Sequence, residues 1–188
     1  MTNKTHENTI QKYRKFEKRK PTRLYRLWAS MLQRCSSAQY KERRPSYKNC
    51  KMSDEFLSFD AFAEWAVKQK NFNMHGWQLD KDLYSVGDPV YSPETCVFLP
   101  ARVNSLLVKG GVKSSGLPPG IRKYKSGNYG VYCEYLGENK TFGCFENLED
   151  ALRLRLKIKQ QFLDDATNPY RQHLDSETLN RISSWFVK

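Results

Sequence analysis

The sequence has 188 residues, and 32 Lys and Arg against 20 Asp and Glu give a formal charge of +12 with a pI near 9.5. This length fits one ordinary domain or two small ones, and the charge predicts a polyanionic partner, because binding phosphates releases their counterions. We expect neither a membrane partner nor a signal peptide, since no apolar run spans a bilayer and the first residues are polar. Five widely spread cysteines are typical of a cytoplasmic chain without a disulfide framework.

Residues 1–22 form the first predicted part, a basic segment without apolar periodicity. A flexible arm that neutralises phosphate is one interpretation of such a charge run, and a solvated tail is the other. Its second half holds most of the cations: Lys12, Arg14, Lys15, Lys18, Arg19 and Lys20.

Helices dominate the next part. A helix is predicted over 23–34, because apolar residues recur there at helical spacing behind Thr22, a good N-cap. A loop rich in Ser, Asn and Pro follows over 36–50. A second helix is predicted over 54–69, with one apolar stripe that we assign to the core. The stripe consists of Phe56, Phe59, Phe62, Ala63 and Ala66.

A β-loop-β-α arrangement comes next, followed by a Gly-, Ser- and Pro-rich linker and a three-stranded sheet with one helix. The β-loop-β-α elements are strands over 78–84 and 96–99 and a helix over 100–108 that begins at Pro100. The later elements are strands over 120–124, 129–135 and 140–145, a helix over 148–163 capped by Asn147, and a short helix in the tail.

The predicted fold class is therefore α+β, with a helical and ββα part before a three-stranded antiparallel sheet packed on one helix. The predicted boundaries are an arm over 1–22, a first module over 23–109, a linker over 110–119, a sheet-plus-helix module over 120–166 and a helical tail over 167–188.

The first module resembles phage HNH nucleases. The resemblance covers residues 24–108, and several separate motifs, among them a Tyr-rich loop that ends at Cys50, occur in the order that this family has them. The others are Trp28-x-x-Met31-x-x-Arg34-Cys35, then Phe59-x-x-Phe62-x-x-Trp65, then Leu79-Asp80-Lys81-Asp82-Leu83 with Tyr91-Ser92-Pro93-Glu94-Thr95-Cys96 and a helix containing Asn104. The resemblance implies a ββα-metal fold that hydrolyses phosphodiester bonds with one divalent ion, for which Mg²⁺ suits oxygen ligands.

Carried over residue by residue, the resemblance makes Asp80 the metal ligand. Lys81 stands where the family has its general-base His, and Thr95 stands where it has an Asn. Asp82 alternates with Asp80 in the predicted strand, so both carboxylates could share one face and hold the metal; exposed carboxylates that balance a basic surface are the alternative. Other residues could supply the missing base or ligand: Asp82, Glu94, Tyr84, Tyr91 or His75.

Three cysteines in the first module leave a zinc site open as an alternative. Cys35, Cys50 and Cys96 with His75 would make four ligands. No Cys-x-x-Cys spacing is present, so we expect buried thiols.

The sheet-plus-helix module resembles the plant ethylene-response-factor (APETALA-type) DNA-binding domain. The matching residues are Gly120-Ile121-Arg122, Gly127-Asn128-Tyr129, Phe142-Gly143-Cys144-Phe145 and Asn147-Leu148-Glu149-Asp150-Ala151. The resemblance implies that the open face of the sheet enters the major groove of double-stranded DNA; a solvated module without a partner is the alternative. The implied groove-facing residues are Arg122, Tyr124, Tyr132, Glu134 and Thr141, with Lys123, Lys125 and Lys140 beside phosphates.

Alternation in the second strand supports this arrangement independently. The pattern predicts one set of side chains toward the helix and the other on the open face. The helix-side set is Tyr129, Val131, Cys133 and Tyr135; the open-face set is Gly130, Tyr132 and Glu134.

Two functions from different classes follow. The first is a metal-dependent DNA endonuclease or nickase of a homing or free-standing phage type, acting in the cytoplasm of a bacterial host and on no small-molecule substrate. The second is a catalytically inactive DNA-binding protein that keeps the nuclease fold. Lys81 and Thr95 favour the second, whereas Asp80, Asp82 and 91–93 favour the first, toward which we lean. The same charge would also permit RNA binding.

Overall fold

A computed structural model describes residues 12–85, 89–107, 116–135 and 138–186. The chain divides into two compact units, residues 1–98 (unit 1) and 99–188 (unit 2). Both units contain helices and antiparallel or short strands, in agreement with the predicted α+β class. None of the described helices is long and apolar enough to cross a bilayer. Residues 1–11 of the predicted arm and most of the predicted linker lie outside the described residues.

Residues 12–22 form a β-hairpin in unit 1, so the prediction of a flexible arm is wrong for this part. Strand β1 (Phe16–Glu17) pairs antiparallel with β2 (Lys20–Pro21). The Thr22 amide donates to the Lys15 carbonyl at 2.9 Å, and the Phe16 ring lies 5.1 Å from that of Tyr25. These contacts fix the hairpin, although the sequence has no apolar pattern there.

Helix α1 (Arg23–Ser36) confirms the first predicted helix, and the Thr22 side chain accepts from the Tyr25 amide as an N-cap. The predicted loop after it is wrong. The hydroxyl of Ser37 caps a further helix, α2 (Ala38–Arg43), and a 3₁₀ helix η1 (Pro45–Tyr47) follows. A single serine therefore restarts the helix where composition alone indicates a loop.

The second predicted helix is present as two. Ser58 has extended backbone between α3 (Asp54–Leu57) and α4 (Phe59–Lys68), and its hydroxyl accepts the Ala61 amide. The predicted core stripe is confirmed, because all five of its residues are buried. The Phe56 ring lies 5.2 Å from that of Phe62, so the stripe forms an aromatic core.

Three short strands of unit 1 and a fourth, β6 (Val97–Pro100), at its boundary with unit 2 follow. β3 (Lys51–Met52) pairs in parallel with β5 (Val90–Tyr91), and neither strand was predicted. β4 (Trp77–Asp80) pairs with β6 (Val97–Pro100). The first strand of the predicted β-loop-β-α arrangement is thus shorter than 78–84, because the chain turns after Asp80.

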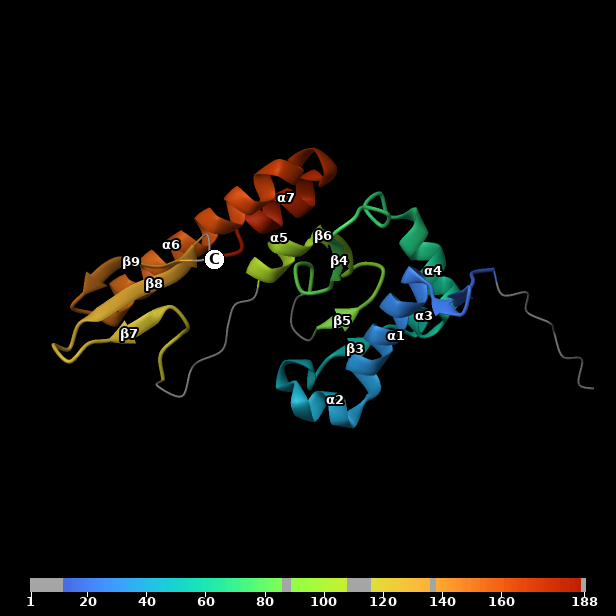
Figure 1. The fold of residues 1–188 in the computed structure, drawn as a ribbon, viewed down its shortest axis with the longest axis horizontal. Coiled ribbons are helices and arrows are strands. Elements are labelled where there is room, and N and C mark those ends of the chain that lie inside the picture. The colour runs from blue at the N-terminus through green and yellow to red at the C-terminus, as the bar shows by residue number, and fades with distance from the viewer. Residues whose placement is uncertain (1–11, 86–88, 108–115, 136–137, 187–188) are drawn as a thin grey trace, which may run out of the picture. The chain divides into compact units, whose positions relative to one another are not determined.

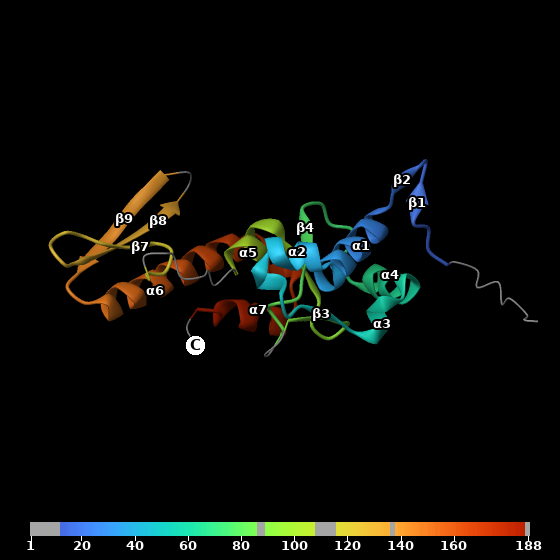
Figure 2. The same ribbon diagram turned by 90° about the horizontal axis from the view of Figure 1, so that it is seen from below.

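Unit 2 contains the predicted sheet, after α5 (Ala101–Leu106), which starts one residue beyond Pro100. Strands β7 (Ile121–Lys123), β8 (Tyr129–Tyr135) and β9 (Glu138–Phe145) form an antiparallel sheet in that order. Helix α6 (Leu148–Thr167) runs along it, with its N-cap formed by Asn147 as predicted (Figures 1 and 2). The core between them is Ile121, Val131, Ala151 and Ile158.

The end of unit 2 is helical, as predicted. A 3₁₀ helix, η2 (Asn168–His173), leads to α7 (Ser176–Ser183), which packs on the second half of α6. Gln160 in α6 donates to the Ile182 carbonyl at 3.0 Å and accepts from the Phe186 amide at 3.0 Å. Buried amide hydrogen bonds of this kind fix the tail to the helix.

Candidate nucleic-acid interface

One face of the β7–β9 sheet carries a cation beside two aromatic rings. Strand register places Arg122 opposite Gly130, on the side away from the core residue Val131. The guanidinium carbon of Arg122 lies 4.5 Å from the ring centroid of Tyr132 and 5.9 Å from that of Tyr124. Cations bind to the faces of aromatic rings, so the two tyrosines orient an exposed arginine on this face.

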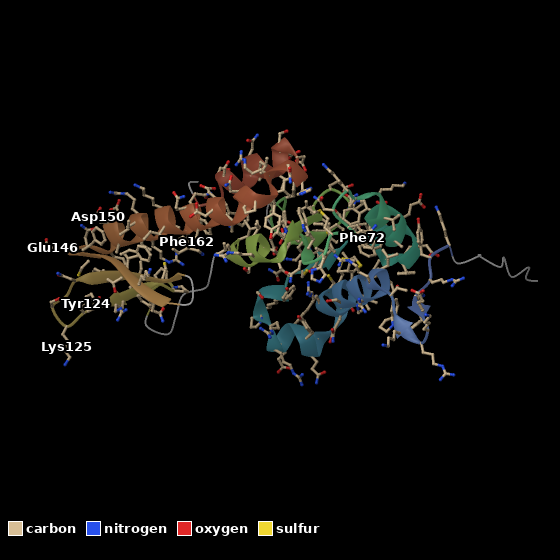
Figure 3. All side chains as sticks on the ribbon, turned by 45° about the horizontal axis from the view of Figure 1, so that its top comes forward. Phe72, Tyr124, Lys125, Glu146, Asp150 and Phe162 are labelled. Atoms are coloured by element: carbon tan, nitrogen blue, oxygen red, sulfur yellow. The ribbon has the colours of Figure 1, made fainter. Side chains whose placement is uncertain are left out.

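Gly130 leaves room at the centre of the same face. A Cβ atom there would lie 2.5 Å from the Tyr124 hydroxyl oxygen and 2.6 Å from a carbon of its ring. The missing side chain therefore allows the Tyr124 ring to cross the strand beside Arg122. Figure 3 shows Tyr124 and Lys125 on the side of the sheet away from α6 and Phe162, which packs against the core.

The remaining predicted contacts divide between this face and its rim. Thr141 is exposed opposite Tyr132 on the open face. Lys123 lies in register with the helix-side residue Tyr129, with its ammonium 5.4 Å from the ring centroid, and Lys140 pairs with Cys133. The alternation predicted for the helix side holds for the described side chains of Tyr129, Val131 and Cys133.

Cys144 also lies on the open face, where alternation did not predict it. A register shift between Val131 and Tyr132 introduces an extra residue into β9, so Thr141 and Cys144 come to the same side. A β-bulge changes the alternation beyond it, and counting by twos from Thr141 puts Cys144 on the wrong face.

Asp80 ends β4 and closes a turn. Its side chain is 6% exposed, and its Oδ1 accepts the amides of Asp82 at 3.0 Å and Leu83 at 2.8 Å. Burial raises the pKa of the Asp80 carboxyl to about 6, against these hydrogen bonds. The prediction that Asp80 and Asp82 alternate in a strand is wrong, because Asp82 already lies in the turn, with an exposed side chain.

Lys81 is buried among aromatic rings and forms an ion pair with Asp82. Its ammonium lies 5.5 Å from the ring centroids of both Tyr47 and Tyr91. Arg34 joins the same cluster, since it donates to the Tyr91 hydroxyl at 2.9 Å. Burial raises the pKa of that hydroxyl, so Tyr91 stays neutral. The two tyrosine rings and the Asp82 carboxylate thus hold the buried Lys81 ammonium in place.

Thr95 closes a turn of its own. Its hydroxyl donates to the Val90 carbonyl at 2.5 Å and accepts the Ser92 amide at 3.1 Å. Over residues 12–85 and 89–107, no hydrogen bond joins Thr95 to Asp80. The other candidates for a general base or a further metal ligand differ in burial. His75 and Glu94 are exposed, Tyr84 is half-buried and Tyr91 is buried.

The carboxylates beside Lys81 do not fit a divalent ion in this arrangement. One oxygen of Asp80 accepts two amides, Asp82 is paired with an ammonium, and that buried ammonium would repel a second cation. The alternative zinc site does not form within the described residues: Cys35 and Cys50 lie with their sulfurs 3.5 Å apart as free thiols, but no group of three ligands is present there.

Comparison of the chain with protein-family models, with curated proteins and with solved structures found no match. The HNH-like and ethylene-response-factor-like resemblances therefore rest on the residues quoted for them.

Proposed function

We propose that this protein binds double-stranded DNA with the open face of the β7–β9 sheet. The observation that carries the proposal is the exposed Arg122 beside the rings of Tyr132 and Tyr124. The arginine fork matches the two acceptors of guanine in the major groove, and tyrosine and lysine side chains suit phosphates. Orienting the guanidinium before binding reduces the entropy lost in the complex. The net charge of +12 supports the same partner.

We expect Arg122→Ala to weaken binding to a cognate duplex about 10- to 100-fold, the range for removing one bidentate hydrogen-bond pair to a base. Fluorescence anisotropy with a labelled duplex at fixed salt measures this change, after selection of a preferred sequence from a random pool. Arg153→Ala is the matched control, because it removes the same charge from an exposed position on α6.

An equal loss of affinity in both variants would overturn the sheet as the interface, since charge alone would then explain binding. Binding to a duplex RNA of the same sequence tests the alternative that RNA is the partner. Its deep, narrow major groove does not admit the sheet, so we expect RNA to bind less tightly than DNA and Arg122→Ala to leave RNA binding unchanged.

A metal-dependent nuclease is the second candidate function. One observation favours it: Asp80 is a buried carboxyl with a raised pKa, and such groups are enriched in active sites. The surroundings of Asp80 favour the non-catalytic alternative more strongly. Lys81 is packed against Tyr47 and Tyr91, and Thr95 is used in a turn, so neither replaces the His or Asn of the HNH nucleases. We therefore propose that this part is a nuclease-like scaffold without catalysis.

We expect wild-type protein to nick supercoiled plasmid no faster with Mg²⁺ or Mn²⁺ than with EDTA, and to bind duplex DNA in all three conditions. Conversion of supercoiled to open-circular plasmid on a gel measures the nicking. Metal-dependent nicking that disappears in Asp80→Ala would establish the nuclease instead. The same variant should keep its duplex affinity, because the proposed interface lies on the β7–β9 sheet.

A further inference from the structure

The β1–β2 hairpin is built to hold its tip in one place. Lys15 directly precedes β1, and its ammonium lies 5.9 Å from the Trp28 ring centroid and 5.5 Å from that of Phe59. The Thr22 hydroxyl donates to the Arg14 carbonyl at 3.0 Å, while its amide donates to the Lys15 carbonyl. Lys15 thus contacts α1 and α4, and the two Thr22 hydrogen bonds close the base of the hairpin, although its composition is that of a solvated tail.

The turn of the hairpin carries cations in an unfavourable backbone conformation. Lys18 has φ +46° and Arg19 has φ +63°, the left-handed region in which a Cβ is crowded. Two-residue hairpins with this geometry favour Asn-Gly or Gly-Gly. Such residues persist only where the surrounding structure holds them, and here both side chains are exposed at the tip.

A depression of about 420 Å³ lies at the base of the hairpin. Its walls include one carboxylate and four cations, together with the beginning of α1: Glu17, Lys18, Lys20, Pro21, Thr22, Arg23 and Arg26. Among the described residues, Lys18 and Lys20 form no ion pair. The depression therefore has an excess of positive charge that the carboxylates of the described residues do not neutralise.

Two of the wall cations are held by the backbone. Arg26 donates to the Pro21 carbonyl at 3.1 Å, and Arg23 donates to the Trp77 carbonyl at 2.8 Å. The N-terminus of α1, at Thr22 and Arg23, also lies at the depression, and the positive end of its dipole favours an anion. Fixed arginines, exposed lysines and a helix start together suit a phosphate group better than an unsupported charge run does.

We propose that this depression, the hairpin pocket, binds a phosphodiester group of the nucleic-acid backbone. That the phosphate comes from DNA depends on the DNA-binding function proposed above. Binding of a phosphate group by the hairpin pocket does not depend on it. The hairpin pocket belongs to unit 1 and the sheet interface to unit 2, so the protein would have two separate contacts with its partner. Contacts with phosphates carry no sequence information, so this contact adds affinity for any sequence.

Pyrophosphate tests the hairpin pocket without DNA. Titrated into the full chain and followed by ¹⁵N amide shifts, it should give saturable changes at residues 18–26 that disappear in Lys18→Ala/Lys20→Ala. Lys68→Ala/Lys70→Ala removes the same charge elsewhere in unit 1 and should leave the changes intact. No saturable shift at 18–26, or equal shifts in both double variants, would overturn the pocket even if the protein binds DNA.

Duplex DNA tests the link between the two proposals. Removing the cation that neutralises one phosphate should lower the slope of log affinity against log salt by about 0.9, and weaken binding about eightfold at 0.1 M salt. We expect Lys18→Ala/Lys20→Ala to do so on every sequence, while Lys68→Ala/Lys70→Ala does not. Unchanged slopes would show that the hairpin pocket does not take a DNA phosphate. Weaker binding by the hairpin variant, with full affinity in Arg122→Ala, would instead overturn the sheet interface alone.

Discussion

Asp80→Asn should stabilise unit 1 by about 3 kcal/mol at pH 7.5. The substitution alters the residue that the HNH resemblance makes the metal ligand. Burial raises the pKa of Asp80 from its ordinary 3.8 to about 6. At about 1.4 kcal/mol per pKa unit, the charged form is destabilised by about 3 kcal/mol in the folded state. Asparagine is neutral, and its carbonyl oxygen can accept the same two amides from Asp82 and Leu83.

The sign of the pH dependence follows from the raised pKa. The folded state holds the Asp80 proton more tightly than the unfolded state does, so this contribution to stability is complete below about pH 4 and is lost as pH rises through about 6. Wild-type stability should therefore fall by about 3 kcal/mol over that window relative to Asp80→Asn. Urea unfolding at a series of pH values from about 4 to about 7.5, followed by tryptophan fluorescence, measures the difference.

Asp54→Asn is the control, because it removes a carboxylate of unit 1 from an exposed position at the start of α3. This variant should keep the wild-type pH dependence. A loss of stability in Asp80→Asn, confined to solutions that contain Mg²⁺, would contradict the expectation and would indicate that Asp80 holds a metal. The stability of this variant thus distinguishes a scaffold from a nuclease without any assay of cleavage.

Lys18→Asn/Arg19→Gly should make the protein more stable and a weaker ligand for DNA. Both positions have positive φ, which costs about 1 kcal/mol or more for each residue with a Cβ, and Asn-Gly suits this turn. We expect the free energy of unfolding to rise by about 2 kcal/mol. Two cations leave the hairpin tip, so duplex affinity at 0.1 M salt should fall by about eightfold for each phosphate that is no longer neutralised.

Thermal unfolding and anisotropy on the same preparations measure the two effects together. Lys68→Ala/Lys70→Ala again removes the same charge and should change neither property by much. An unchanged unfolding temperature in the Asn-Gly variant would mean that the turn is not strained. Unchanged affinity would mean that the tip does not touch the nucleic acid, and the hairpin would then be a purely structural element.

Periodicity predicted the long elements of this fold well. Helices α1 and α6 and strand β8 occur where apolar spacing placed them, and Thr22 and Asn147 cap the two helices as expected. Each of these elements buries one face, so apolar residues recur along it at the spacing of a helix or a strand. The prediction was weakest where a single polar residue decides the local structure.

Ser37 and Ser58 are two such residues. Each accepts an amide three residues on and begins a helix, so a predicted loop contains α2 and a predicted helix is divided. The parallel pair β3 and β5 has two residues in each strand, too few to show a period. Long-range pairing of this kind is not visible in local sequence.

The candidate sites were predictable to different degrees. Alternation predicted which side chains lie on the open face of the sheet as far as the bulge. Beyond the bulge the alternation in β9 is shifted by one residue, so Cys144 lies on the open face together with Thr141. At Asp80, residue types indicated a carboxylate pair on one strand, but the amides of Asp82 and Leu83 turn the chain immediately. The burial of Lys81 depends on tyrosines as distant in the chain as Tyr47, which no local pattern contains.

Helix α6 belongs to two cores at once. Ala151 and Ile158 of this helix cover the sheet, whereas other parts of the helix, which also carries the buried Leu163, pack against α5 and α7. A gene fragment confined to residues 120–166 would lack both α5 and α7 and would expose the apolar side chains of α6 that these two helices cover. The piece that evolution could transplant between proteins is therefore the whole of residues 99–188, tail included.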